Sequence, residues 1–314
     1  MNYRYLANLS TPEKRVDVVL DTDAFNEVDD QFAISYLINC EEKLNIRGIY
    51  AAPFLNARSK SPRDGMEKSY REIIKLLKIA NREDLIPLVL RGCTDYLDDE
   101  KASLFSEASA NIVKLALEHS PEDPLYVIAI GCITDVASAL LMNPEIALNI
   151  VIVWLGGHSI DYPHTKEFNL FQDIAAARVV FKSEAPLVQL PCEGVVSHFE
   201  VSLAELEYYL RAKNELSDYL LHSVRQETDK LEEGVLPSRV IWDVTAVAWL
   251  MNDNLKFMRQ KLIPSYLPDY NGKYSSTEIG KPINYIYSIN RGALLEDMIK
   301  RIAKINNFKV EKNG

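Results

Sequence analysis

Cysteine is scarce in this chain, which has 314 residues and four cysteines. Cys40, Cys93, Cys132 and Cys192 lie too far apart in sequence for the paired spacing of a zinc site. Four scattered cysteines do not suit a disulfide framework in a chain of this length either. We therefore expect reduced and mostly buried thiols in a cytoplasmic protein.

Long apolar runs and an excess of positive charge are missing too. No stretch approaches the about 18 consecutive apolar residues of a membrane-spanning helix, and the first residues lack the apolar run of a signal peptide. The 35 basic and 45 acidic residues give a formal net charge of −10. Because nucleic acids and anionic membranes would repel such a chain, we expect neither as a partner. A small neutral or cationic ligand, or a divalent metal ion, fits better.

Apolar segments are plentiful, and they alternate with helical patterns. The chain is 47% hydrophobic, and its short apolar runs predict strands at 16–20, 46–51, 88–90, 125–130, 150–155, 187–190 and 285–289. Amphipathic patterns predict helices at 29–39, 67–78, 104–117, 134–141, 202–225, 244–251 and from 291. This alternation indicates an α/β fold with a mostly parallel central sheet and helices on both faces. We expect a single domain over residues 1–314, with a loop at 267–282.

Four aspartates surround the loop that follows the first predicted strand. Asp21 and Asp23 stand at its carboxyl end, where open α/β sheets bind ligands, and Asp29 and Asp30 open the next helix. Four carboxylates around one loop repel one another unless a cation neutralises them, and Ca²⁺ prefers oxygen ligands of this kind. The alternative is that Asp29 caps the helix while the other carboxylates are solvated.

Two other metal-binding families also place aspartates in this way. The calcium loop of an EF-hand requires an oxygen ligand at its fifth position and glycine at its sixth, where this chain has Phe25 and Asn26. A haloacid-dehalogenase-type phosphatase also begins with strand-Asp-x-Asp and would use Asp21 as nucleophile with Mg²⁺. That family expects Thr or Val in place of Phe25 and has no use for the later aspartate pair, but it stays an alternative.

The acidic loop resembles the N-terminal signature of the inosine-uridine preferring nucleoside hydrolases. The usual form of that signature is Asp-x-Asp-Pro-Gly-x-Asp-Asp-Ala, and this chain has Asp21-Thr-Asp23, then Asp29-Asp30-Gln-Phe-Ala33. The segment between the aspartate pairs, Ala24 to Val28, is longer here and has neither Pro nor Gly.

Three later segments agree with the same family in the same order. Ile130-Gly-Cys-Ile-Thr134-Asp-Val-Ala is similar to the family's Leu-Gly-Pro-Leu-Thr-Asn-hydrophobic-Ala. Two glycines at 156–157, followed by Glu167-Phe168-Asn169, resemble its Gly-Gly…Glu-Phe-Asn stretch. Trp242-Asp243 matches a late aspartate that opens a helix. The four blocks extend from about residue 16 to about residue 250 and are specific together, not singly.

This resemblance implies a Rossmann-like nucleoside hydrolase that uses Ca²⁺ to cleave nucleosides into free base and ribose. It implies homodimers or homotetramers as well, since relatives of this fold class commonly form them. Asp21 would brace the loop, and Asp29 would accept a hydrogen bond from a ribose hydroxyl, as would Glu167 and Asn169. The implied calcium ligands are the carboxylates of Asp23, Asp30 and Asp243 and the backbone carbonyl of Thr134.

These roles are also chemically reasonable. Cleavage of a glycosidic bond develops positive charge on the sugar, which nearby carboxylates stabilise. Asp23, beside a metal-bound water, is then the natural general base. Glu167 and Asn169 could instead be ordinary loop residues, and Thr134 could also cap its helix. The altered segment after Asp23 keeps open a third possibility, a nucleoside-binding or ribose-binding protein without catalysis.

The residue before the late aspartate bears on the choice of base. The pyrimidine-accepting branch has His there, whereas Trp242 resembles the purine-specific branch, in which Trp stacks on the base. Trp242 could also be a core residue. We predict the second stacking aromatic at Tyr96 first, with Tyr162 and Phe54 as alternatives.

Further polar residues are candidates for the leaving-group side and the sugar. His158, His164 and Asp161 flank the loop that leads to Glu167, and each could be an acid near the base or a 5′-side contact. A loop histidine can also be merely solvated. Asn56, which follows the second predicted strand, is a candidate ribose contact.

Overall fold

An eight-stranded sheet forms the centre of the structure, a computed structural model that describes residues 3–229 and 235–304. Its strand order is β3-β2-β1-β4-β5-β6-β10-β9, and all neighbours are parallel except the antiparallel pair β10 and β9. The mostly parallel sheet predicted from the sequence is confirmed. The strands are β1 (Val16–Thr22), β2 (Leu44–Ala51), β3 (Val89–Arg91), β4 (Leu125–Ala129), β5 (Ile150–Leu155), β6 (Leu187–Leu190), β9 (Met258–Pro268) and β10 (Tyr274–Ile289).

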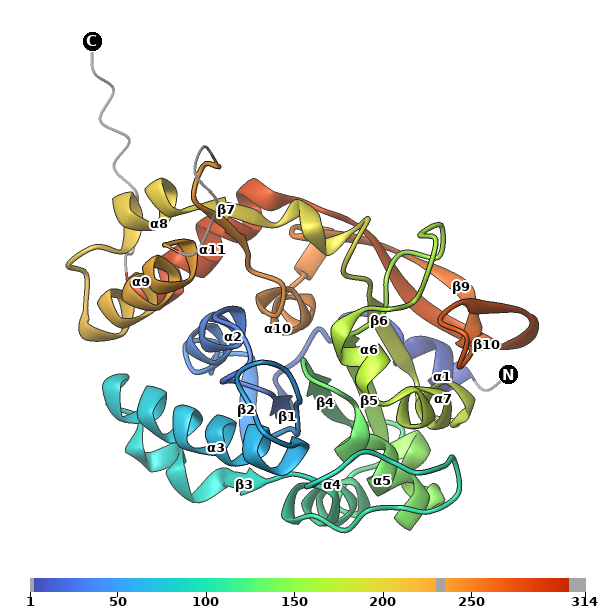
Figure 1. The fold of residues 1–314 in the computed structure, drawn as a ribbon. Coiled ribbons are helices and arrows are strands. Elements are labelled where there is room, and N and C mark those ends of the chain that lie inside the picture. The colour runs from blue at the N-terminus through green and yellow to red at the C-terminus, as the bar shows by residue number, and fades with distance from the viewer. Residues whose placement is uncertain (1–2, 230–234, 305–314) are drawn as a thin grey trace.

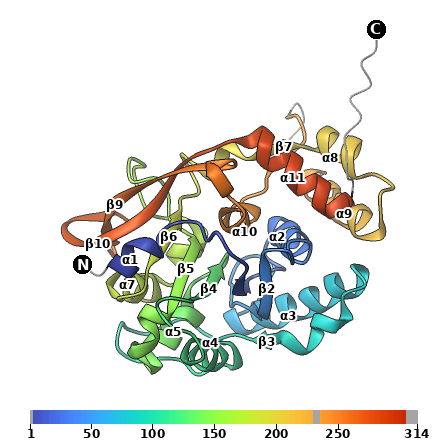
Figure 2. The same ribbon diagram turned by 180° about the vertical axis from the view of Figure 1, so that it is seen from behind.

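Helices cover both faces of this sheet (Figures 1 and 2). One face packs against α4, α5 and α7, and the other against α2, α3 and α10, with α9 and α11 packed against α2 in the same hydrophobic cluster. The helices are α1 (Tyr3–Ala7), α2 (Asp29–Leu37), α3 (Pro62–Ile79), α4 (Glu107–Leu117), α5 (Thr134–Met142), α6 (Phe168–Gln172), α7 (Ile174–Lys182), α8 (Leu203–Leu210), α9 (Glu215–Thr228), α10 (Val244–Leu250) and α11 (Arg291–Ala303). No helix of the described residues has the length and apolar character needed to cross a membrane.

Strand β1 explains why both faces are covered. Side chains alternate along a strand, so Val18 and Leu20 enter the hydrophobic cluster on the α2 side while Val19 enters the cluster on the α5 side. All three side chains are fully buried. The same alternation directs Asp21 toward α5 and Thr22 toward α2, which separates the roles of these neighbouring residues.

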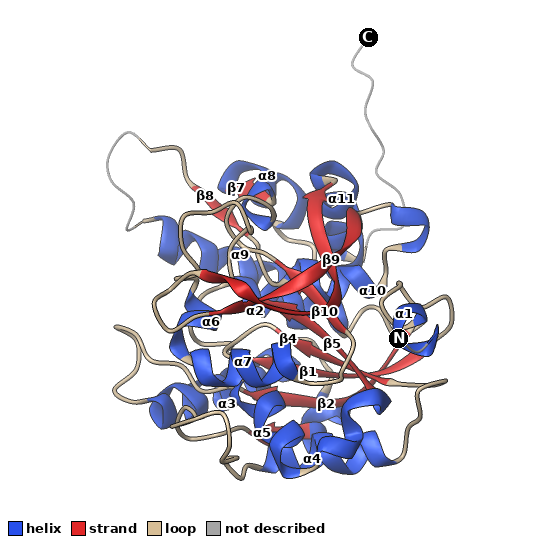
Figure 3. Ribbon diagram, turned by 90° about the vertical axis from the view of Figure 1, so that its right-hand side faces the viewer, coloured by secondary structure: helices blue, strands red, loops and turns tan. Residues whose placement is uncertain are grey.

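The edge of the sheet differs from the prediction. Residues 267–282, expected to be a loop, mostly belong to the β9–β10 hairpin, which faces the viewer in Figure 3. Pro264 and Pro282, which favour a break in the sequence pattern, are paired opposite each other in the hairpin. Pro264 lies in the edge strand β9, and Pro282 lies in β10 just outside its pairing with β6 at Asn284 and Tyr285, where a missing N–H is tolerated.

The region 202–225, expected to be helical, contains two helices, α8 and α9. Ala212 has a positive φ of 58° between them, and the Asn214 side chain accepts a hydrogen bond from the backbone N–H of Ser217 at the start of α9. The prediction also missed α6, α7 and a small antiparallel sheet formed by β7 (Glu200–Ser202) and β8 (Ser238–Val240).

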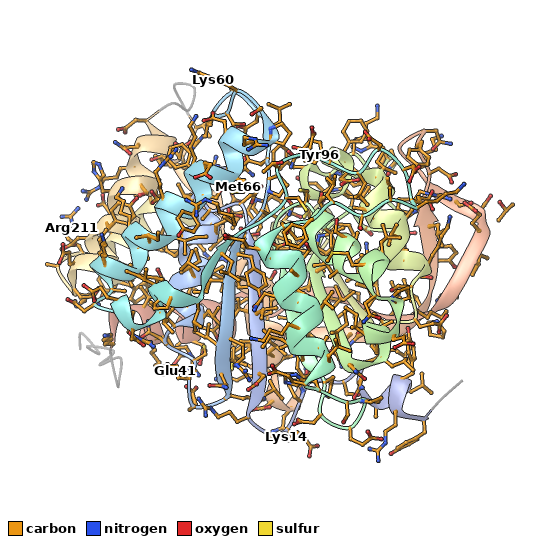
Figure 4. All side chains as sticks on the ribbon, turned by 90° about the horizontal axis from the view of Figure 1, so that it is seen from below. Lys14, Glu41, Lys60, Met66, Tyr96 and Arg211 are labelled. Carbon is orange, nitrogen blue, oxygen red and sulfur yellow. The ribbon has the colours of Figure 1, made fainter. Side chains whose placement is uncertain are left out.

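The two ends of the sheet are distinct. In Figure 4, Lys14 and Glu41, which precede β1 and β2, lie at the end opposite Lys60 and Tyr96, which follow β2 and β3. The acidic loop follows β1 and therefore lies at the carboxyl end, together with the loops after β4, β5 and β6.

We expect Leu37→Ala to lower the free energy of unfolding by about 2–5 kcal/mol, because it leaves a cavity in the core. Leu37 is the last residue of α2 and is fully buried. Leu117→Ala is the matched control, since Leu117 ends α4 and is 56% exposed. Chemical denaturation of both variants tests this, and equal losses would contradict the assigned core.

Candidate active site at the carboxyl end of the sheet

A pocket of about 190 Å³ opens at the carboxyl ends of β1, β4, β5 and β6. Parallel sheets bind ligands at this end because loops from several strands converge there. The lining residues are mostly polar, and seven of them are acidic. They are Asp23, Asn26, Glu27, Asp29, Asp30, Ile130, Leu155, His158, Lys166, Glu167, Phe168, Asn169, Cys192, Glu193, Trp242 and Asp243.

Three aspartates form a compact group in this pocket. Asp29 and Asp30 are the first residues of α2, and Asp243 directly precedes α10, which packs against α2. Each offers a carboxylate oxygen within 4.8 Å of those of the other two, and all three are buried. The N-terminal end of α2 favours negative charge, but one helix end does not balance three carboxylates.

Burial and mutual repulsion both oppose ionisation of this group. Burial raises the pKa of Asp29 and Asp243 well above the ordinary aspartate value, and neighbouring carboxylates raise both further. The pKa of Asp30 is raised to about 7 by burial, although a 2.5 Å hydrogen bond from the Thr22 hydroxyl opposes the rise. Only a cation would allow all three to ionise together at neutral pH.

Asp23 lies beside this group at the end of β1. It is 1% exposed, and its Oδ2 is buried without a hydrogen-bond partner among the described residues. Gly131, just after β4, lies so close that a Cβ there would come within 3.3 Å of the Asp23 carboxyl carbon. The possible ligands are buried carboxylate oxygens, and the Asp23 Oδ2 is one that no described residue satisfies. A hard divalent cation fits such a set of oxygen donors.

Thr134, expected as a metal ligand through its backbone carbonyl, does not line the pocket, and neither does Asp21, which was expected to brace the loop. Asp21 is fully buried on the α5 side, near Asp135, and burial raises its pKa well above the usual value. A phosphatase of the kind considered above would need Asp21 exposed to substrate. The Thr134 hydroxyl donates to Asp173 at 2.6 Å, so its side chain braces the start of α5.

Glu167 and Asn169 line the pocket from the start of α6, as their motif suggested. The Glu167 carboxylate accepts hydrogen bonds from the backbone N–H groups of Gly157, Asn169 and Leu170 at 2.8–2.9 Å. The Asn169 side-chain nitrogen donates to the carbonyls of Ile130 and Leu155 at 3.1 Å, which ties α6 to the ends of β4 and β5. These bonds fix both side chains. None of them involves the side-chain oxygen of Asn169, Oδ1.

Trp242 and His158 also line the pocket, whereas Asn56 and Asp161 do not. Asn56 instead donates to the Asn26 side-chain oxygen at 2.6 Å, and Asp161 is exposed. The His158 ring lies 4.5 Å from the ring of Tyr162 and 5.3 Å from that of His164. Burial, and then the neighbouring His164, lower the pKa of His158 to about 4, so its imidazole is neutral at neutral pH.

The aromatic partners expected for Trp242 are placed elsewhere. Tyr96 donates to Gln172 at 2.5 Å, Phe54 is fully buried, and neither lines the pocket, nor does Tyr162. The aromatic rings of the lining are those of His158, Phe168 and Trp242.

Several lining residues were not predicted from the sequence. Asn26 and Glu27 belong to the segment that departs from the family pattern, and Lys166 and Phe168 flank the expected Glu167. The remaining four follow or end strands, a position that could have indicated them: Ile130, Leu155, Cys192 and Glu193.

Comparison with known proteins points to one family. The family model of the inosine-uridine preferring nucleoside hydrolases matches residues 18–310. The chain is 23% identical to the pyrimidine-specific ribonucleoside hydrolase RihA of Escherichia coli O1:K1 over 266 residues, which are 76% of this chain and 80% of that protein. It is 30% identical to the non-specific ribonucleoside hydrolase RihC of Salmonella newport over 166 residues, or 51% of each chain.

Solved structures agree on the fold. A purine-preferring ribonucleoside hydrolase from Gardnerella vaginalis superposes with a TM-score of 0.73 at 19% identity, covering 92% of this chain and 98% of the other. The plant nucleoside hydrolase PpNRh1 gives a TM-score of 0.71 at 17% identity, covering 93% and 99%. At these identities the similarity shows the fold and does not indicate a preferred base.

We expect the metal-free protein to lose stability as the pH rises from about 4 to about 7, because Asp30 in the folded state keeps a proton that the unfolded chain, with a pKa of about 3.9, has released. Melting temperatures in a chelator should therefore fall over this range. Added Ca²⁺ should restore most of the loss at the upper end, since a cation replaces the proton. The Asp30→Asn side chain cannot titrate, so this variant should show a flatter dependence of melting temperature on pH. An unchanged dependence would contradict the raised pKa of Asp30.

Proposed function

Because the chain belongs to the inosine-uridine preferring nucleoside hydrolase family, whose members are enzymes that hydrolyse nucleosides, we propose that it cleaves the N-glycosidic bond of purine nucleosides. The products are the free base and ribose. The observation that carries the proposal is the group of buried carboxylates in a pocket that Trp242 also lines. The proposed enzyme is a single domain over residues 1–314.

We propose Ca²⁺ as the resident cation. Its proposed ligands are the carboxylates of Asp23, Asp30 and Asp243. The backbone carbonyl of Thr134, first expected as a further ligand, belongs to a residue outside the pocket lining and is less favourably placed. When bound, it would orient ribose hydroxyls and lower the pKa of a water molecule. A carboxylate oxygen of Asp29 lies within 4.8 Å of those of Asp30 and Asp243. From this position Asp29 would accept the proposed hydrogen bond from a ribose hydroxyl bound beside the cation.

Asp23 is the proposed general base. Its Oδ2, which has no hydrogen-bond partner within residues 3–229 and 235–304, is available to take a proton from the attacking water. The water oxygen then bonds to C1′ while the C1′–N bond breaks, and that electron pair leaves with the base. Positive charge on the sugar is stabilised by the surrounding carboxylates.

Other side chains have proposed roles in binding. Glu167 and Asn169 contact ribose hydroxyls, and the fixed orientations described above preorganise them for it. His158, neutral because its pKa is about 4, contacts the substrate. Trp242 stacks on the base. Asn56 and Asp161 lie off the pocket lining and are less favourably placed for the contacts first expected of them.

All four cysteines are unpaired and buried, which suits a reducing compartment such as the cytoplasm. We propose a homodimer or homotetramer by analogy with relatives of this fold.

Asp23→Asn should lower kcat for inosine hydrolysis by about 10²–10⁴-fold, because an amide cannot accept the proton from water. A reducing-sugar assay in Ca²⁺ or in a chelator measures this. Asp123→Asn is the control, since Asp123 pairs with Lys14 at the opposite end of the sheet. Full activity of the Asp23 variant would overturn the assignment, and calcium-dependent binding of inosine without release of base would indicate a binding protein.

Trp242→Ala should raise KM for purine nucleosides by roughly tenfold, since stacking of a base on an aromatic ring contributes about 1–3 kcal/mol. Trp242→Phe should retain most of the affinity. A panel of inosine, guanosine, adenosine, uridine and cytidine separates the purine preference from general activity. Equal KM changes for purines and pyrimidines would argue against a base-selective stack.

A further inference from the structure

The segment that departs from the family pattern, residues 24–28, is held firmly on its α3 side. Ala24 and Val28 are buried in the core, and Asn26 is 8% exposed. The Asn26 backbone N–H donates to the Asp23 carbonyl at 2.7 Å, and the Asn56 side chain donates to the Asn26 side chain at 2.6 Å. The Phe25 backbone N–H donates to the Ser69 hydroxyl at 3.3 Å. The segment is thus an ordered wall of the pocket.

An ion pair ties this wall to the segment that leads into Trp242 and Asp243, which also line the pocket. Arg239, in β8, donates through Nη2 to a Glu27 carboxylate oxygen at 2.9 Å. Glu27 itself lines the pocket. Trp242 and Asp243 follow Arg239 by three and four residues. The pair therefore joins the segment that leads into Asp29 and Asp30 to the segment that leads into Asp243.

The position of this pair matters more than its strength. The Arg239 and Glu27 side chains are 25% and 44% exposed, and ion pairs of such exposure contribute little to global stability. The two segments that it joins, however, bring carboxylates within 4.8 Å of one another, and these repel. A tie between the segments opposes their separation before a cation binds.

We propose that Glu27 and Arg239 are positioning residues, which hold Asp29 and Asp30 against Asp243 in the geometry that binds the cation and the nucleoside. The proposal rests on the proposed function for the identity of the substrate. It rests on the ion pair and the aspartate group alone for cation binding. Glu27 belongs to the lengthened loop. This departure from the family pattern would therefore contribute to the binding of the cation and the nucleoside.

The test uses the full chain with three single variants, Glu27→Gln, Arg239→Gln and the control Glu67→Gln. Glu67 pairs with Arg91 at 2.7 Å, with exposures of 34% and 41%, and neither residue lines the pocket. Isothermal titration calorimetry with Ca²⁺ alone gives Kd, and steady-state hydrolysis of inosine gives KM and kcat.

We expect both pocket variants to raise Kd for Ca²⁺ and KM for inosine by about three- to fivefold, the range for a partly exposed ion pair. At saturating Ca²⁺ and inosine, kcat should change by less than about twofold, since bound ligands then hold the walls together. The Glu27→Gln/Arg239→Gln double variant should be no worse than either single variant. The differences in Kd and KM between these variants and the unaltered protein should shrink at about 1 M salt, where screening weakens the ion pair. The Glu67 control should match the unaltered protein.

Arg239→Gln is the decisive variant, because it removes a positive charge near the aspartates. If these residues acted only through their charges, this variant would bind Ca²⁺ more tightly, and the proposal would be overturned. An unchanged Kd and KM in Arg239→Gln, with KM raised in Glu27→Gln, would show direct contact of Glu27 with substrate and would also overturn it. Restored affinity in the reversed pair Glu27→Arg/Arg239→Glu would support it.

Failure of the proposed function would look different. If the unaltered chain bound Ca²⁺ but hydrolysed no nucleoside, that function would fail, and the calorimetric comparison would still decide the role of the ion pair. If nucleosides were hydrolysed and the two pocket variants matched the control in Kd and KM, the function would stand and the positioning role would fail.

Discussion

Burial of several carboxylates side by side is the constraint on which the rest of this structure depends. Asp29, Asp30 and Asp243 are brought within 4.8 Å of one another where water cannot screen them. Burial and repulsion both raise their pKa values, so the folded chain stores an electrostatic cost that a cation relieves. A cation that binds there removes this electrostatic cost, and the free energy released adds to the affinity of the site for the cation.

The fold meets this cost by placing the carboxylates on rigid elements. Asp29 and Asp30 begin α2, and Asp243 precedes α10, and these two helices pack together on one face of the sheet. Alternation along β1 sends the Thr22 hydroxyl to Asp30 and turns Asp21 to the other face. Neighbouring aspartates in the sequence thereby acquire different surroundings. The ends of β4 and β5 complete the support through Asn169.

The sequence predicted the parts of the molecule whose pattern is local. Buried strands such as 125–130 and 150–155 are continuous apolar runs, and the strand-end rule placed Asp23 in the pocket. The resemblance to the family brought in Asp243, which is distant in sequence from Asp23. The β9–β10 hairpin was missed because prolines interrupt its pattern, while the edge position that makes them harmless is a tertiary property. Asn56 was expected in the site for its place after β2, but in the structure its side chain bonds to Asn26.

The loop at residues 24–28 shows why resemblance alone does not describe this pocket. The family signature has a short Pro-Gly turn at this point, whereas this chain has a longer segment in which Glu27 contacts β8 through Arg239. An ion pair of this exposure adds little to folding free energy, but repulsion between buried carboxylates makes the spacing of the two walls sensitive to small forces. Precision in such a site therefore depends on contacts outside the ligand sphere as well as on the ligands themselves. The longer segment at residues 24–28 supplies Glu27, and through its ion pair with Arg239 the departure from the family motif would help to hold the metal-binding aspartates in place.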